Sequence, residues 1–192
     1  MKLYKILVFL LLISFTACNN ADFSPKPRGF YRISFPEKTY LSIKEDLPYS
    51  FEIPSYATLN IDSSEGTNRY WKNLDFPTFN ATLHISYFPI SSKANLNQLT
   101  EDARTFAFKH SAKASAIDQI TINKTHKNVY GLTYLIKGNT ASNLQFFLTD
   151  STNKYLRAAL YFNEKPNLDS IQPVLDFLRR DIDHIVDTFE WK

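Results

Sequence analysis

The 192-residue sequence contains a single cysteine, Cys18, and only four glycines. One cysteine cannot form an intramolecular disulfide, so a domain built from this chain needs an ordinary hydrophobic core. Four scattered glycines leave no glycine-rich loop to hold a phosphate group. A formal net charge of +3 provides no basic stripe, which argues against nucleic acid as a partner. Aromatic residues, in contrast, make up 15% of the chain, a composition that favours a β-rich core.

The N-terminus lacks a hydrophobic run long enough to span a bilayer. Its apolar segment, Ile6–Phe15, is ten residues long, whereas a membrane-spanning helix needs about 20. The segment follows two lysines and precedes two small residues and Cys18, the pattern of a lipoprotein signal peptide. We therefore expect residues 1–17 to be a signal peptide, Cys18 to carry the acyl chains of a membrane anchor, and residues 18–28 to be a lipidated tether. The alternative is an ordinary secretory signal with an unrelated cysteine.

The remaining residues, 29–192, are predicted to form a single domain with many strands. Alternating polar and apolar residues predict short strands at 31–35, 49–53, 56–61 and 81–88, and four consecutive antiparallel strands at 118–125, 129–137, 143–150 and 154–162. In the strand at 143–150, Leu144, Phe146 and Leu148 face one way and Phe147 faces the other. Because both faces carry apolar residues, we expect a sheet that is covered on both sides.

Two segments change to a spacing of three and four residues, which predicts amphipathic helices. The first is 96–112, with Asn95 as its N-cap, and the second runs from Leu168 to Phe189, with Asn167 or Asp169 as its cap. The predicted fold class is therefore α+β, a mainly antiparallel sheet covered by helices on both faces, with a long C-terminal helix. This order of elements resembles a PsbP/Mog1-like sandwich.

Residues 65–80 are predicted to form an aromatic loop. They include four large aromatic side chains among prolines and polar residues, a composition like that of protein interfaces: Tyr70, Trp71, Phe76 and Phe79. These four residues are the candidate partner-binding residues. The alternative is that the loop packs them onto the edge of its own sheet.

No sequence pattern supports catalysis or a metal site. The four histidines lack the spacing of metal ligands, and no cysteine other than Cys18 is present to join them. His84 and Ser86 share a strand face and could act as base and nucleophile, but no nucleophile-elbow sequence accompanies them. His184 lies among three aspartates on the polar side of the last helix, which indicates a solvated face. We therefore expect no enzyme activity, metal or cofactor, although acids from distant positions could still converge.

Three segments resemble the gliding motility lipoprotein GldD family. They are PKPRGFYRISFPEKTY at 25–40, EDARTFAFKH at 101–110, and the whole stretch from VYGLTYLIK to the C-terminal FEWK, 129–192. Members of this family often have a cysteine just before a segment similar to PYSFEIP, where this chain has Leu47. The resemblance implies a component required for gliding and linked to the type IX secretion apparatus. It carries over no catalytic residues, and Cys18 alone as a functional position.

These inferences together predict a membrane-anchored envelope lipoprotein that acts as a non-enzymatic scaffold or assembly factor. Its expected partners are the membrane, through the lipid anchor, and other gliding or type IX secretion proteins. The alternative is a periplasmic module that binds a small ligand or peptidoglycan in a cavity lined by Tyr and Phe. Only Asp22 follows the lipid site closely, whereas surface-exposed lipoproteins of gliding bacteria resemble one another in an acidic cluster there. We expect a periplasm-facing domain on the outer membrane or, alternatively, on the cytoplasmic membrane.

Overall fold

The computed structural model describes residues 32–64, 66 and 68–192. Residues Arg32–Lys192 form one compact unit. The predicted signal peptide, the acylation site Cys18 and the tether at 18–28 lie outside the described residues, so they stay predictions. In the described part of the chain, no helix is both long and apolar enough to cross a bilayer.

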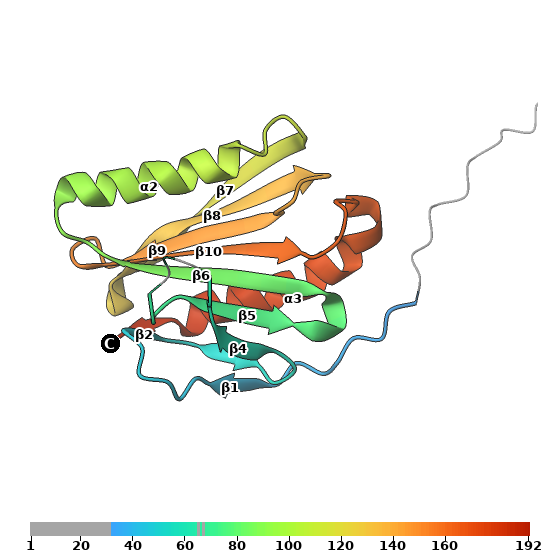
Figure 1. Ribbon diagram of the computed structural model, residues 1–192, viewed down its shortest axis with the longest axis horizontal. Helices are drawn as coiled ribbons and strands as arrows, with labels where there is room; N and C mark the ends of the chain where they lie inside the picture. Colours follow the sequence, from blue (N-terminus) through green and yellow to red (C-terminus); the bar gives the residue numbers. More distant parts are fainter. Residues whose placement is uncertain (1–31, 65, 67) are drawn as a thin grey trace, which may run out of the picture. The chain divides into compact units, whose positions relative to one another are not determined.

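A seven-stranded antiparallel sheet forms the centre of this unit (Figure 1). Each strand pairs with its neighbour in antiparallel register. In order across the sheet, the strands are β4 (Thr58–Ile61), β5 (Lys72–Phe76), β6 (Ala81–Pro89), β10 (Lys154–Phe162), β9 (Leu144–Thr149), β8 (Val129–Gly138) and β7 (Ala114–Lys124). The strand predicted at 81–88 and the four predicted between 118 and 162 are thus confirmed, with small shifts at their ends.

The beginning of the described chain differs from its prediction. Residues 32–35 are not in a strand, and the first strand is instead β1 (Tyr40–Ser42). Pro36 lies between these two segments, and a proline cannot donate a backbone hydrogen bond to a neighbouring strand. Two small antiparallel sheets complete the β-structure: β1 pairs with β3 (Glu52–Pro54), and β2 (Tyr49–Ser50) pairs with the C-terminal β11 (Glu190–Trp191).

The predicted aromatic loop contains a strand of the main sheet. Residues Lys72–Phe76 form β5, which pairs with both β4 and β6, and Pro77–Phe79 form a short 3-10 helix. Along β5 the side chains of Lys72, Leu74 and Phe76 are buried, while the two residues between them are partly exposed. The sequence pattern did not predict this strand because its first inward residue is a lysine. Lys72 can be buried because its ammonium pairs with the carboxylate of Glu45.

Two helices cover the sheet, as predicted. Helix α2 (Lys93–Phe108) begins three residues earlier than expected, because Ser92 and not Asn95 is its N-cap. The Ser92 hydroxyl accepts a hydrogen bond from the backbone N–H of Asn95, and the Asn95 side chain accepts one from the N–H of Ser91. Helix α3 (Leu168–Thr188) follows Asn167 directly, and its Pro173 lies within the helix.

The helices lie on opposite faces of the sheet (Figure 1). On the α3 face, Leu144, Phe146 and Leu148 of β9 join the larger hydrophobic core with the buried side of α3. On the α2 face, Phe147 belongs to a smaller core with Ala103 and Ala107 of α2. This alternation confirms the predicted facing of β9 and the predicted fold class of an antiparallel sheet between two helices.

Candidate functional site

Two of the four candidate partner-binding residues belong to the core. Phe76 is 0% exposed, and Phe79 is buried against Phe35, Tyr56 and Phe177. Phe76 points inward because it alternates with Asp75 along β5. The prediction that Phe76 and Phe79 present their rings to a partner is therefore wrong. These two side chains pack onto their own sheet, which was the alternative interpretation of this segment.

The other two candidates, Tyr70 and Trp71, are partly exposed where the chain enters β5. The Trp71 indole N–H donates to the carbonyl oxygen of Tyr87 at 2.8 Å, and its ring packs edge-on against Phe88 at 5.2 Å. Tyr70 packs edge-on against Tyr87, with ring centroids 5.7 Å apart. Both residues are held in place yet keep part of their surface free, so they stay candidates for contact with a partner.

A buried carboxylate joins the start of the described chain to the last helix. Asp181 of α3 is 0% exposed. Its Oδ1 accepts from the Lys38 ammonium at 2.6 Å and from the Tyr40 hydroxyl at 2.9 Å, and its Oδ2 accepts from the Tyr56 hydroxyl. Burial and the hydrogen bond to Asp181 raise the pKa of Tyr40 to about 12, so this phenol stays a donor at physiological pH.

The same cluster extends to His184, one turn further along α3. The imidazole stacks on the Tyr40 ring with centroids 3.6 Å apart, and its Nε2 lies 2.7 Å from a carboxylate oxygen of Glu52. The expectation of a solvated face around His184 is therefore wrong for Asp181, which is buried. Lys38 and Tyr40, near the start of the described chain, cover this side of α3. The periodicity of the helix itself could not predict their contact with Asp181.

A second polar cluster lies on the opposite face of the sheet, beside α2. Arg157 of β10 donates from Nη2 to the side-chain oxygen of Gln145 on β9 at 3.0 Å, and its guanidinium lies 4.3 Å from the centroid of the Phe106 ring. Gln145 is 2% exposed. A charged residue within the apolar run LRAALYF and an amide within LQFFLT were the signals that sequence reasoning passed over.

The proposed base and nucleophile do not form a pair. His84 Nδ1 lies 2.8 Å from the side-chain oxygen of Asn73, and its ring packs against Tyr161. Among the residues that the structure describes, no hydrogen bond joins His84 to Ser86, and no group of three or more potential metal ligands is present.

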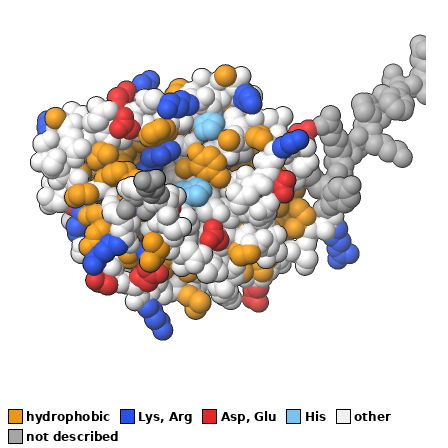
Figure 2. Space-filling model, in the orientation of Figure 1, with side chains coloured by type: hydrophobic (Ala, Val, Ile, Leu, Met, Phe, Trp, Pro, Cys, Tyr) orange, Lys and Arg blue, Asp and Glu red, His pale blue; other side chains and the backbone are white. Residues whose placement is uncertain are grey.

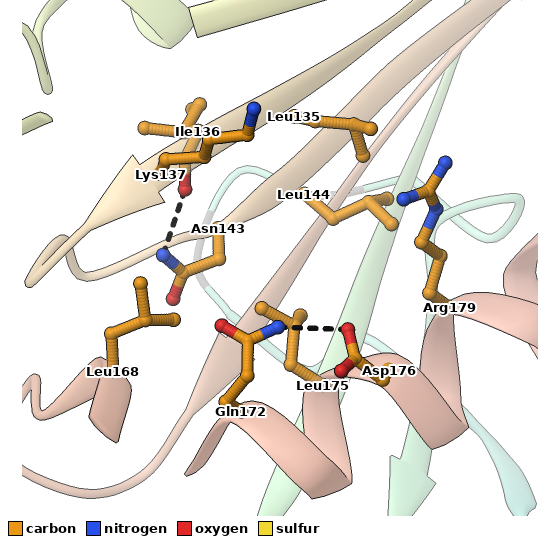
Figure 3. Close-up of a pocket in the computed structure, with 10 residues that line it drawn as sticks. All are labelled: Leu135, Ile136, Lys137, Asn143, Leu144, Leu168, Gln172, Leu175, Asp176 and Arg179. Carbon is orange, nitrogen blue, oxygen red and sulfur yellow. Dashed lines mark hydrogen bonds between the residues drawn. The ribbon is translucent and has the colours of Figure 1, made fainter. Parts of the chain in front are cut away.

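A pocket of about 90 Å³ lies between the sheet and the first turns of α3 (Figure 3). Figure 3 shows leucines from both sides of this pocket and two hydrogen bonds at its rim, from Asn143 to the carbonyl of Ile136 and from Gln172 to Asp176. Pockets that bind small molecules have volumes of about 300–1,000 Å³. This pocket has room for a few atoms only, and its lining contains no aromatic residue: Leu135, Ile136, Lys137, Asn143, Leu144, Leu168, Gln172, Leu175, Asp176 and Arg179.

Comparison with solved structures defines the class of fold. The chain is similar to the solution structure of cyanobacterial PsbP (CyanoP) from Synechocystis sp. PCC 6803, with a TM-score of 0.50 and 12% sequence identity. The match covers 88% of this chain and 100% of that chain. The protein is thus an α+β protein with a PsbP-like fold. Among curated proteins, none matches the chain.

The family is shown by a second comparison. The family described as gliding motility lipoprotein GldD matches residues 20–191, nearly the whole chain after Cys18. The chain therefore belongs to the GldD family of gliding motility lipoproteins. Membership of a lipoprotein family implies that the protein is associated with the cell envelope through a membrane anchor.

Proposed function

We propose that this protein is an envelope lipoprotein that supports gliding as a non-enzymatic scaffold or assembly factor, in contact with the gliding and type IX secretion machinery. The family match over residues 20–191 carries this proposal. The chain would be held by acyl chains on Cys18, with its domain facing the periplasm, on the outer membrane or on the periplasmic face of the cytoplasmic membrane.

The contacts of the ionisable side chains support a scaffold. Asp181 is occupied by Lys38, Tyr40 and Tyr56, and the buried Lys72 pairs with Glu45. Such pairs bind distant parts of the chain to one another and leave these groups without a free position for a substrate. The partly exposed Tyr70 and Trp71 are the aromatic residues that we propose for contact with a partner.

The alternative, a module for a small ligand or peptidoglycan, gains no support from the pocket of Figure 3. That pocket is lined by aliphatic and polar residues instead of Tyr and Phe, and its volume of about 90 Å³ is below the range of about 300–1,000 Å³ for small-molecule sites. A larger hollow of about 510 Å³ beside Glu52 and Thr188 is open to solvent.

Substitution of the anchor tests the proposal directly. We expect Cys18→Ala to remove the protein from the membrane fraction and to abolish gliding, because the domain loses its confinement to the bilayer surface. Ser24→Ala, in the same tether, is the matched control and should keep both properties. Normal motility of the Cys18→Ala strain at normal protein levels would contradict the role of the anchor.

Crosslinking tests the partners. In cells that carry the wild-type protein, mild crosslinking and purification should recover gliding or type IX secretion components. Trp71→Ala should reduce the recovery of these components. Lys93→Ala, at an exposed position at the start of α2, is the control. Recovery of no such component above background would overturn the scaffold proposal.

A further inference from the structure

Strand β7 lies at one edge of the seven-stranded sheet (Figure 1). Within the described chain it pairs on one side only, with β8. It is 11 residues long, whereas strands of about 5–6 residues are the most common. Along the free side of an edge strand, alternate residues direct their backbone N–H and C=O groups outward, where another strand can pair with them. The sheet can therefore accept a further strand beside β7.

Proteins usually protect such an edge by keeping it short or by placing a proline, a lysine or a bulge in it. Residues 117–123 of β7 contain neither proline nor lysine. The irregular register of β7 is confined to its first residues, between Ala114 and Ala116. The opposite edge strand, β4, has only four residues. The central part of β7 is thus the longer and less protected of the two edges.

This part of β7 is also exposed, and it includes a large apolar side chain. Residues 118–121 are all exposed, and Ile120 is 43% exposed. Because side chains alternate along a strand, Ile120 lies on the same face as Ile122, which is buried in the core on the α3 face. A strand added beside β7 would cover Ile120 and extend this core.

The sequence of β7 complements itself in one antiparallel register. When Thr121 lies opposite Thr121 of a second copy, Asp118 lies opposite Lys124. These are the charged residues of β7, and each copy contributes both, so the register forms two pairs of opposite charge. It also places Ile120 opposite Ile122, and such apolar and threonine pairs stabilise a sheet.

The neighbouring registers lack this match. A two-fold axis through the sheet keeps every side chain on its own face, so the axis must pass through a single residue of each strand. An axis at residue 119, 120, 122 or 123 places either Asp118 or Lys124 opposite an isoleucine. Charge complementarity therefore selects the register that is centred on Thr121.

Both charged residues have partners in their own copy, and these partners leave room for a further contact. Asp118 pairs with Lys137 at 2.8 Å, and its side chain is 48% exposed. Lys124 donates to the carbonyl of Val186 and to the carboxylate of Asp187, and an ammonium has three donors. Each end of the interface would thus bring two lysines and two aspartates together, a balanced set of charges.

The charge of the whole chain does not oppose association of identical copies. Its formal net charge is only +3, and Figure 2 shows acidic and basic side chains interspersed over one face of the described residues. A surface of one sign would make identical copies repel one another.

We propose that two copies of this chain associate edge to edge through residues 118–124 of β7, so that their sheets form one continuous antiparallel sheet. Contacts that bury less than about 1,200 Å² are typically weak, so for a contact of this length we expect a dissociation constant on the order of 10–100 µM. This association does not depend on the scaffold function, since it rests on the β7 edge alone.

Sedimentation velocity of the full-length protein in detergent, over a range of protein concentrations, measures the association. Ile120→Lys should weaken it at least about tenfold, because the two introduced ammonium groups lie close together in the dimer. Ile61→Lys makes the same change at an exposed position of β4 and is the matched control. A wild-type protein that stays monomeric above the expected dissociation constant, or equal weakening by both variants, would overturn the proposal.

A charge exchange tests the register. Asp118→Lys and Lys124→Glu should each weaken association, since like charges then face one another in both pairs. A mixture of the two variants should form a heterodimer, because every introduced charge then faces an opposite charge. Copurification of the two variants through different affinity tags measures this, and a mixture that associates no better than either variant alone would overturn the register.

Thr121→Cys tests the same register if Lys124→Glu fails to fold, because this exposed position keeps both charges. In membranes, a short bismaleimide should link two copies, since side chains directly opposite one another lie about 5 Å apart at Cβ. Thr58→Cys, at an exposed position of β4, is the control and should give little crosslinked dimer. Absence of the Thr121→Cys dimer, or a crosslink to a different protein in its place, would overturn self-association.

Discussion

Asp181 receives its hydrogen bonds from residues more than a hundred positions away in the sequence. Lys38 donates both to its carboxylate and to the backbone carbonyl of Phe177, and the ammonium also lies 3.6 Å from the centre of the Phe177 ring. A buried carboxylate without such partners would be strongly unfavourable. At the scale of single residues, this cluster therefore holds the first described segment, which begins at Arg32, against α3.

Removal of either charge in this pair should be costly. We expect Asp181→Asn to lower the free energy of unfolding by about 3–5 kcal/mol, because the Lys38 ammonium loses its counter-charge in a mostly buried position. Urea denaturation at neutral pH measures the change. The double variant Lys38→Met and Asp181→Asn should lose less than the sum of the single variants.

The control for this pair is Asp187→Asn. Asp187 pairs with Lys124, but its side chain lies largely in solvent, so the expected loss is below about 1 kcal/mol. Equal losses for Asp181→Asn and Asp187→Asn would show that burial does not strengthen the pair with Lys38.

Asp150 should make stability depend on pH in the acidic range. Partial burial alone would raise its pKa, but backbone N–H groups of Lys154, Thr152 and Asn153 donate to its carboxylate and lower the pKa below the ordinary value. A lowered folded-state pKa contributes stability above the unfolded value of about 3.9, and this contribution is lost as the pH falls through the folded pKa.

The measurement compares the wild-type protein with Asp150→Asn. The variant keeps an oxygen acceptor but has no charge, so it should be less stable by about 1 kcal/mol at pH 7, a small value because solvent screens this carboxylate. The difference should decrease as the pH falls from the ordinary aspartate pKa of about 3.9 through the lowered pKa of Asp150. A difference that stays constant from pH 7 to pH 2 would show that the charge has no role in the turn between β9 and β10.

At the scale of elements, the start of α2 depends on a side chain just outside the helix. Ser92→Ala removes the hydroxyl that accepts from the Asn95 N–H, so we expect a loss of about 1 kcal/mol in the free energy of unfolding. Asn95→Ala removes only the bond to Ser91 outside the helix and should cost less. Thermal denaturation of both variants gives the comparison. A larger loss of stability for Asn95→Ala would support Asn95 as the N-cap, as the sequence pattern predicted.

Periodicity predicted those elements whose inward residues are all apolar. The inward residues of β9, Leu144, Phe146 and Leu148, are all apolar, so alternation was enough to assign their face. Strand β5 was missed because its first inward residue is Lys72, which needs Glu45 from a separate segment. A rule based on apolar residues does not count a buried lysine as inward, since its partner is not visible locally.

The polar clusters were missed for the same reason, since their partners lie far away in the sequence. Asp181 was assigned to a solvated face because its partners Lys38, Tyr40 and Tyr56 come from the other end of the chain. The pairing of Arg157 with Gln145 depends on the register between β9 and β10, which the sequence does not specify. The fold class could thus be predicted from local patterns, whereas the candidate sites depend on contacts between distant residues.

At the scale of the whole described unit, the two faces of the sheet are unequally packed. The core on the α3 face contains most of the buried apolar residues and extends into β2, β5, β6 and the C-terminal Phe189. The core beneath α2 contains six buried residues, of which two are alanines. Partly buried polar groups, Arg157 among them, lie next to this smaller core. Less apolar area therefore holds α2 than holds α3.

This asymmetry predicts that α2 opens before the rest of the unit unfolds. Local opening requires less free energy where fewer buried apolar contacts are broken, so the amides of α2 should exchange with deuterium faster than those in the central turns of α3. Hydrogen exchange with mass spectrometry, on the full-length protein in detergent, measures both helices in one experiment. Ala107→Gly, at a buried position of α2, should increase exchange in α2 and leave α3 unchanged. If α2 and α3 exchanged at the same rate, and Ala107→Gly affected both equally, the two faces would unfold as one cooperative body.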